Sequence, residues 1–154
     1  MKLYLIRHAQ AEDGSPDFDR SLTRAGRERS LLLAGWLGPW LTGGRLLSSP
    51  AARALEMAEI LYREIQFDGK LKQDRLLYDG SLEAITSMLL RREDQVLAVV
   101  GHEPTFSQLA GRMLGGHPAL ELKKGGVIRL DLEPGRPATL RWLLDPRLLE
   151  RGPG

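Results

Sequence analysis

Two histidines follow apolar runs whose composition is typical of buried β-strands. His8 directly follows 3–7 (LYLIR), and His102 directly follows 96–101 (VLAVVG). Neighbouring parallel strands end at the same edge of a sheet, where open α/β sheets bind their ligands. We therefore expect both imidazoles to face one pocket. The third histidine of the chain, His117, lies in a Gly-His-Pro string and is expected in a surface turn.

Two arginines are placed to join the same pocket. Arg7 precedes His8, and Arg53 follows the string 48–50 (SSP), which predicts the start of a helix. Helix N-termini offer free backbone N–H groups and the positive end of the helix dipole, both suited to an anion. Guanidinium groups bind phosphoryl oxygens through pairs of parallel N–H donors. Two histidines and two arginines together predict a phosphoryl-binding site.

The chemistry predicted for this site is phosphoryl transfer to a histidine. A ring nitrogen can attack phosphorus only when it is neutral, and neighbouring cations lower an imidazole pKa. Arg7 and Arg53 would therefore bind the phosphate and also keep His8 deprotonated. His102 would donate to the phosphoryl oxygens as charge develops in the transition state.

Four further residues are candidates for the same site. Alkoxide leaving groups need a positioned acid, and Asp79 and Glu83 are the candidates for that general acid by their place in the chain. A phosphoramidate needs less help, because protonated imidazole already leaves easily. Gln10 and Glu103 adjoin the histidine strings and are candidates for substrate contacts. The alternative for Glu103 is that it only begins a helix.

Strand-like and helix-like segments alternate along the chain. Thr23 and Ser81 are placed as N-caps, and Ser49-Pro50 predicts an N-cap followed by proline in the first helical turn. The segment 96–100 lacks polar alternation, so we expect a central strand covered on both faces. The pattern predicts a single domain over 1–154, a three-layer α/β/α sandwich whose mostly parallel sheet has an antiparallel edge. The expected strands are 2–6, 45–48, 96–100, 127–132 and 138–144, and the expected helices are 24–40, 50–64, 82–89 and 104–114, with a loop over 11–21 and a turn over 78–80.

The composition excludes several kinds of protein. There is no cysteine, which rules out disulfides, thiolate catalysis and cysteine zinc sites, and neither a His-Glu-x-x-His nor a Walker string occurs. The net charge is only +2, and the basic residues are interspersed with acidic ones, so we expect no nucleic-acid partner. Apolar runs are too short to span a membrane, and strand-like residues directly follow Met1, which leads us to expect a cytoplasmic protein. The preference for arginine over lysine fits a GC-rich or thermophilic source.

Four strings resemble the motifs of the histidine phosphatase superfamily, also called phosphoglycerate-mutase-like or RHG proteins. The strand and Arg-His-Gly of that family resemble 5–9 (LIRHA), and its Ser-Ser-Pro-x-x-Arg-Ala motif resembles 48–58. Its strand followed by Gly-His resembles 96–102, and its Leu-Thr-x-x-Gly helix entry resembles 22–26. The chain departs from the family in having Ala9 for the usual glycine and Met57 for a common threonine.

The resemblance implies roles for the four central residues. His8 would be the nucleophile that becomes phosphorylated, and Arg7, Arg53 and His102 would form the phosphate pocket, with no metal or other cofactor required. The short chain and its Arg-His-Ala string resemble the SixA-type branch, which lacks the long helical insertion of the mutases. The implied function is hydrolysis of phosphohistidine on a protein such as a histidine phosphotransfer domain, by a monomer. The alternatives are a phosphatase for small phosphomonoesters and a non-catalytic phosphate-binding module.

Overall fold

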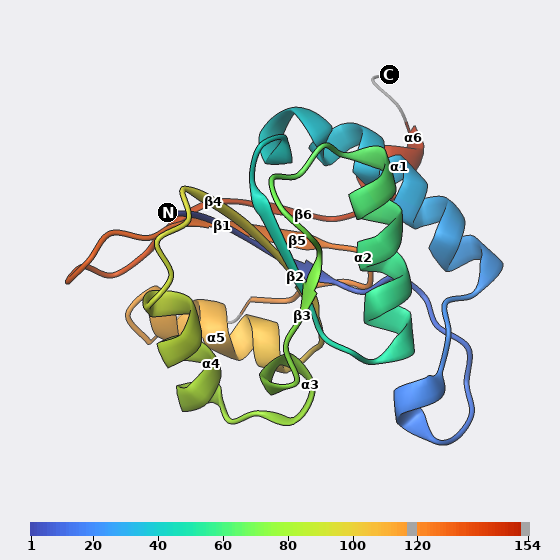
Figure 1. Cartoon of the computed structure of the whole chain (residues 1–154), viewed down its shortest axis with the longest axis horizontal. Helices are drawn as coiled ribbons and strands as arrows, with labels where there is room; N and C mark the ends of the chain where they lie inside the picture. Colours follow the sequence, from blue (N-terminus) through green and yellow to red (C-terminus); the bar gives the residue numbers. More distant parts are fainter. Residues whose placement is uncertain (117–119, 152–154) are drawn as a thin grey trace.

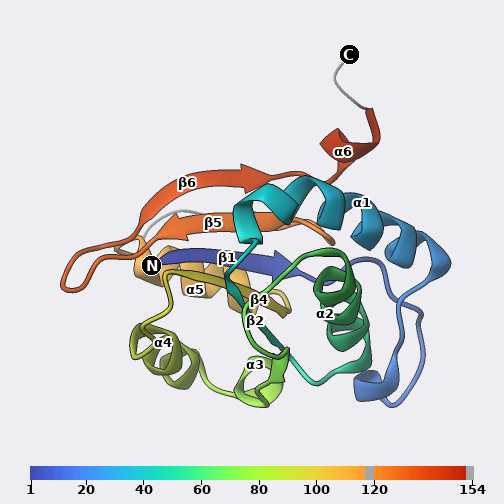
Figure 2. The ribbon, with the colours of Figure 1, turned by 45° about the horizontal axis from the view of Figure 1, so that its top comes forward.

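The computed structural model describes residues 1–116 and 120–151, so His117 lies outside the described residues. Within them, six strands form one sheet in the order β3-β2-β4-β1-β5-β6, with helices on both faces (Figures 1 and 2). The four strands β3, β2, β4 and β1 are parallel, and β5 and β6 add an antiparallel edge. The predicted sandwich is confirmed. The strands are β1 (Lys2–Arg7), β2 (Arg45–Ser48), β3 (Lys72–Gln73), β4 (Val96–Gly101), β5 (Val127–Asp131) and β6 (Thr139–Leu144).

Side chains of the central strands alternate between two apolar cores. In β1, Tyr4 and Ile6 pack with α1 (Arg24–Leu41) and α2 (Ala52–Glu64), while Leu3 and Leu5 pack with α4 (Leu82–Leu90) and α5 (Thr105–Met113). In β4 the residues 97–101 are buried, as expected for a strand covered on both faces. Each core therefore binds one helical layer to the sheet and fixes the ends of β1 and β4.

Local signals placed most helix ends correctly. The Thr23 hydroxyl accepts from the Gly26 N–H, and the Ser81 hydroxyl accepts from the Ala84 N–H, so both predicted N-caps are confirmed. The predicted helix start at Ser49-Pro50 is wrong by two residues: α2 begins at Ala52. The Ser49 N–H still donates to the Val100 carbonyl, which keeps this part of the chain in the sheet.

Short elements escaped the sequence analysis. The predicted turn at 78–80 is instead the end of α3 (Leu76–Asp79), and Gly80 follows as its C-cap. A 3₁₀ turn, η1 (Asp17–Asp19), lies within the predicted 11–21 loop, and α6 (Arg147–Arg151) follows β6. Periodicity cannot reveal such elements, because they hold about one turn or less.

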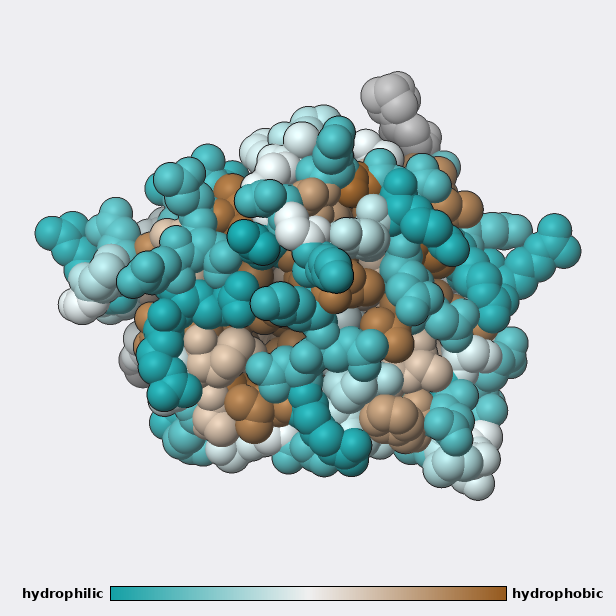
Figure 3. All heavy atoms as spheres, in the orientation of Figure 1, coloured by the Kyte–Doolittle hydropathy of each residue, from teal (hydrophilic) through white to brown (hydrophobic). Residues whose placement is uncertain are grey.

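Polar side chains dominate the face shown in Figure 3, with apolar groups scattered between them. Trp36 and Trp40 on α1 are partly exposed, and both contact the Trp142 ring of β6, so they pack the helix onto the antiparallel edge. In the ranges 1–116 and 120–151, no helix has the length and apolar character needed to cross a membrane.

The register of β1 and β4 brings the two predicted histidines together. Arg7 pairs with Gly101, and the His8 N–H donates to the Gly101 carbonyl over 3.0 Å. His8 and His102 therefore leave adjacent parallel strands at the same edge. Their ring centroids are 5.3 Å apart.

We expect the substitution Gly101→Ala to destabilise the protein by about 1–3 kcal/mol, as overpacking of a core does. A Cβ at this position would lie 2.5 Å from Cζ of Phe106, whose ring is fully buried. Urea unfolding measures the effect. The matched control is Gly35→Ala on α1, where a Cβ meets nothing within 4 Å; it should be neutral or stabilising by up to about 1 kcal/mol. Equal stability of the two variants would contradict the prediction.

Candidate active site

His8 is held as a neutral imidazole with one ring nitrogen directed at Arg53. Its Nδ1–H donates to the Ala9 carbonyl over 2.8 Å, because a carbonyl can only accept. Its Nε2 accepts from Nε–H of Arg53 over 3.2 Å, so Nε2 carries the lone pair. The hydrogen bond at Nδ1 thus fixes the tautomer that a nucleophilic Nε2 requires.

Ser49 holds the second imidazole. The Nε2 atom of His102 lies within hydrogen-bond distance, 2.7 Å, of the Ser49 hydroxyl oxygen. That oxygen accepts from the Ala51 N–H just before α2. Both His102 and Ser49 are buried, so this contact sets the ring orientation. Sequence analysis placed Ser49 as a helix cap and missed its contact with His102.

Arg53 is the centre of the site. It is the second residue of α2, its side chain is only 8% exposed, and its guanidinium contacts two residues at once. Nε donates to His8, Nη1 donates to the Asp17 carbonyl over 2.8 Å, and Nη2 donates to Oδ2 of Asp17 over 3.1 Å. The two N–H groups suited to bidentate phosphate binding are therefore engaged by Asp17.

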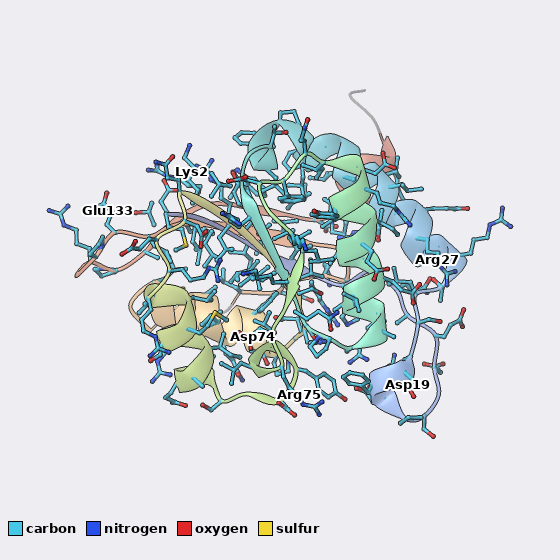
Figure 4. The ribbon with its side chains drawn as sticks, in the orientation of Figure 1. Lys2, Asp19, Arg27, Asp74, Arg75 and Glu133 are labelled. Atoms are coloured by element: carbon cyan, nitrogen blue, oxygen red, sulfur yellow. The ribbon has the colours of Figure 1, made fainter. Side chains whose placement is uncertain are left out.

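The Asp17 carboxylate accepts hydrogen bonds from three side chains. Besides Arg53, it accepts from the Tyr78 hydroxyl over 3.0 Å and from Arg20 over 2.9 Å. Phe18 packs edge-on against Tyr78, and Arg75 lies over the Phe18 ring, which joins η1 to α3 at the rim of the site. Figure 4 labels Asp19 on η1 and Arg75 just before α3. Sequence analysis did not single out Asp17, since it is one of several aspartates in a polar loop.

Arg7 enters from the β5 side. Its Nη1 donates to the Leu122 carbonyl over 2.8 Å, which fixes the side chain at the end of β1. Its Nε, like Nδ1 of His102, is buried and has no hydrogen-bond partner among the described residues. Such unpaired buried atoms are uncommon in folded proteins. Three occur among the described residues; two belong to the predicted phosphoryl site, and the third is Nε of Arg129 on β5.

Burial and positive charge keep both imidazoles neutral. Burial is the largest cause that lowers the pKa of His8, to about 4; Arg53 and Arg7 add to it, and the bond to Ala9 opposes it. Burial also lowers the pKa of His102, to about 3, with smaller effects from His8 and Arg53. Both side chains are therefore uncharged at neutral pH, and for His8 this is the state that attack on phosphorus requires.

We expect His8 and His102 to remain neutral until the pH falls to about 4 and about 3. Histidine-selective ¹⁵N NMR of the free protein measures these midpoints. An unfolded histidine titrates near 6.5, so the unfolded chain binds protons first and the free energy of unfolding decreases as pH falls from about 6.5 towards 4. Site histidines with midpoints near 6.5 would contradict the prediction.

Two of the other predicted residues serve local structure. The Gln10 side chain accepts from the Thr23 hydroxyl over 3.0 Å, which ties the catalytic segment to the start of α1. The Glu103 carboxylate accepts from the backbone and hydroxyl of Ser107 in the first turn of α5. That is the helix-starting role stated as the alternative for Glu103.

The two candidate acids point to other partners. The Asp79 carboxylate accepts from Arg75 over 3.0 Å, and that of Glu83 accepts from Arg112 over 3.1 Å. Both carboxylates are exposed. The structure thus brings His8, His102, Arg7 and Arg53 to one edge of the sheet, and leaves Asp79 and Glu83 in surface ion pairs.

The family follows from sequence and geometry together. Residues 3–78, which include His8 and Arg53, match the model of the histidine phosphatase superfamily (branch 1). The chain belongs to the histidine phosphatase superfamily. In this histidine phosphatase the third resembling motif, Gly101-His102, lies beyond the matched range, and β4 places it beside the first. No curated protein sequence matches the chain.

Solved structures of phosphatases share the fold of this histidine phosphatase over nearly its full length. The protein histidine phosphatase SixA, complexed with tungstate, is 24% identical, with a TM-score of 0.88 over 97% of this chain and 99% of that one. SixA from Agrobacterium tumefaciens, a candidate phosphohistidine phosphatase, is 28% identical, with a TM-score of 0.79 over 94% and 97%. A phosphoserine phosphatase mutant from Entamoeba histolytica is 15% identical, with a TM-score of 0.73 over 95% and 98%.

Proposed function

We propose that this histidine phosphatase removes phosphoryl groups from phosphohistidine on proteins, by way of a phosphohistidine at His8. The family and its phosphatase neighbours support a phosphatase. The narrower substrate class rests on the site itself. The observation that carries it is the state of Asp17, the carboxylate bonded to the same guanidinium as His8.

A general acid for an ester must carry a proton near neutral pH, so its pKa has to be raised. Asp17 has the opposite character: the hydrogen bond from Arg20, with those from Tyr78 and Arg53, lowers its pKa to about 2. A phosphoramidate can react without such an acid, because protonated imidazole is a good leaving group. An anionic Asp17 does not supply that acid, and Asp79 and Glu83 accept from surface arginines instead. This arrangement favours phosphohistidine over a phosphate ester.

The reaction proceeds in two displacements at phosphorus. Nε2 of His8 forms a bond to phosphorus as the substrate N–P bond breaks. The substrate imidazole, protonated on its other ring nitrogen, takes the bonding pair and leaves as neutral imidazole. Arg7, Arg53 and His102 surround the phosphoryl oxygens and stabilise the charge that they carry in the transition state. Water then attacks phosphorus, and the His8 N–P bond breaks. The inorganic phosphate keeps the protons of the water, and His8 is released as a neutral imidazole with its proton on Nδ1.

Access to the site suits a protein substrate. The elements at its rim are the three residues of η1 and the four of α3, joined by Phe18 and Tyr78. A phosphohistidine on the surface of a partner protein can approach a site with such a short rim more readily than a site covered by a folded domain. We propose that the partner is a phosphohistidine-bearing protein such as a histidine phosphotransfer domain.

The test is turnover with EDTA present on a phosphorylated histidine phosphotransfer domain, on free phosphohistidine and on a panel of small phosphate esters. The proposal expects kcat/KM to be highest for phosphohistidine substrates, with rapid-quench trapping of a phosphoenzyme. Preference for an ester would replace it with a small-molecule phosphomonoesterase. A folded protein that binds phosphate but turns over nothing would show a non-catalytic binding module.

A further inference from the structure

A basic hollow adjoins the end of β1 at Arg7. Its volume is about 360 Å³, and it opens between the segment before β5 and the segment after β6. Five cationic side chains line it against one carboxylate, that of Asp145. The cations are Arg7, Arg29, Lys123, Lys124 and Arg147. Arg7 belongs both to this hollow and to the predicted phosphoryl site, so the hollow adjoins that site.

Backbone hydrogen bonds fix the hollow relative to His8. The Gly125 N–H donates to the carbonyls of both Arg7 and His8, each over 3.1 Å. Gly125 itself has φ +75°, in the left-handed region that favours glycine, which allows this close approach. Lys123 and Lys124 immediately precede it. A partner whose phosphohistidine reaches His8 therefore meets these lysines at a set position.

The charge in the hollow is only partly compensated. Lys123 pairs with Glu121 over 2.6 Å, Arg147 pairs with Asp145 over 2.7 Å, and Arg29 pairs with Glu150. No carboxylate of the described residues lies within ion-pair distance of Lys124, which is exposed. In each pair at least one partner is largely exposed to solvent, which weakens the attraction between the two charges. Positive potential consequently remains available to an incoming anionic surface.

The opposite side of the site carries the other sign. The 11–21 loop has four acidic residues, Glu12, Asp13, Asp17 and Asp19, against the single cation Arg20. Figure 2 shows η1, within this loop, well separated from α6, which begins at Arg147 beside the hollow. The mouth of the site is therefore polarised, and an approaching charged surface is oriented by it.

We propose that this hollow is a docking subsite for acidic side chains of the partner protein, next to the phosphohistidine; this rests on the proposed function. Exposed lysines and arginines bind one small anion weakly, because solvent and salt screen the interaction. A protein surface that presents several carboxylates together gains both a faster encounter and a fixed orientation. The same surface placed over the 11–21 loop would be repelled.

Reversing the charge of the two lysines distinguishes an effect on partner docking from an effect on the catalytic step. The double variant Lys123→Glu/Lys124→Glu is compared with Lys70→Glu/Lys72→Glu, which makes the same change at exposed positions by the far edge strand β3. The substrates are a phosphorylated histidine phosphotransfer domain with acidic side chains beside its phosphohistidine, and free phosphohistidine. Both are measured at low and high salt, with urea unfolding as a check on folding.

We expect kcat/KM of Lys123→Glu/Lys124→Glu on the phosphoprotein to fall by about 10-fold or more at low salt, and the loss to shrink as salt is added. Turnover of free phosphohistidine should stay within about twofold, and the β3 control should match the parent protein on both substrates. Neutralising the acidic side chains of the partner should remove the difference between the variants.

Two results would overturn the docking subsite alone. Unchanged kinetics on the phosphoprotein would show that the lysines do not meet the partner, and equal losses on both substrates would assign them to a small-anion site or to the catalytic fold. A parent protein that hydrolyses esters and neither phosphohistidine substrate would instead contradict the proposed function. The two failures are therefore distinguishable.

Discussion

Replacing His8 with alanine is expected to lower kcat by about 10⁴-fold or more, the scale seen when a nucleophile is removed from a covalent mechanism. Nε2 of His8 is the ring atom that carries a lone pair and lies beside Arg53. Alanine leaves no group to form the N–P bond, while Arg7, Arg53 and His102 remain to bind phosphate. Single-turnover assays with ³²P-labelled phosphohistidine measure the loss, and acid-free gels measure the labelled enzyme.

The result depends on three comparisons. His8→Ala should bind phosphate and unfold cooperatively in urea, yet incorporate no label where the parent protein does. The variants Asp79→Asn and Glu83→Gln serve as controls, because both carboxylates pair with surface arginines, and each should stay within about twofold of the parent. Label retained by His8→Ala would place the nucleophile elsewhere. A large loss in Asp79→Asn or Glu83→Gln would restore an acid and favour an ester substrate.

Residues on regular elements could be placed from the sequence. The run 2–6 predicted a buried strand, and the run 96–100, which lacks polar alternation, predicted a central one. As parallel neighbours these strands bring His8 and His102 to one edge of the sheet. Arg53 was placed by the helix-start signal, although that signal misjudged where α2 begins. The burial of a strand depends on the hydrophobic pattern of a whole segment, and such a pattern can be recognised in a single sequence.

Contacts made by loops could not be placed in the same way. Asp17 reaches Arg53 across 36 positions, and Tyr78 reaches Asp17 across 61. Nothing in the 11–21 loop distinguishes Asp17 from Asp13 or Asp19, since its role depends on where η1 lies over α2. Such contacts follow from tertiary placement, and local patterning carries no record of it.

Replacing Arg53 with lysine is expected to lower kcat/KM by about 10²–10³-fold, the effect of removing one stabilising donor from a developing charge. The guanidinium has three donors in use, one toward His8 and two toward Asp17. A phosphoryl group that takes the latter pair must displace Asp17 from it. A lysine ammonium keeps the positive charge but lacks the two parallel N–H donors of the guanidinium. Steady-state kinetics should therefore show the fall in kcat/KM although the net charge is unchanged.

The matched variant is Asp17→Asn, which leaves Arg53 intact and removes the negative charge that competes for it. If the guanidinium acts on the phosphoryl group, this variant should bind inorganic phosphate several-fold more tightly, as measured by competitive inhibition, and should keep most of its turnover. If Arg53 served only to anchor η1 through Asp17, then Asp17→Asn and Arg53→Lys would lose activity together. Opposite changes in phosphate affinity between the two variants therefore assign the forked donors of Arg53 to the substrate, with Asp17 as the group that holds them until the substrate arrives.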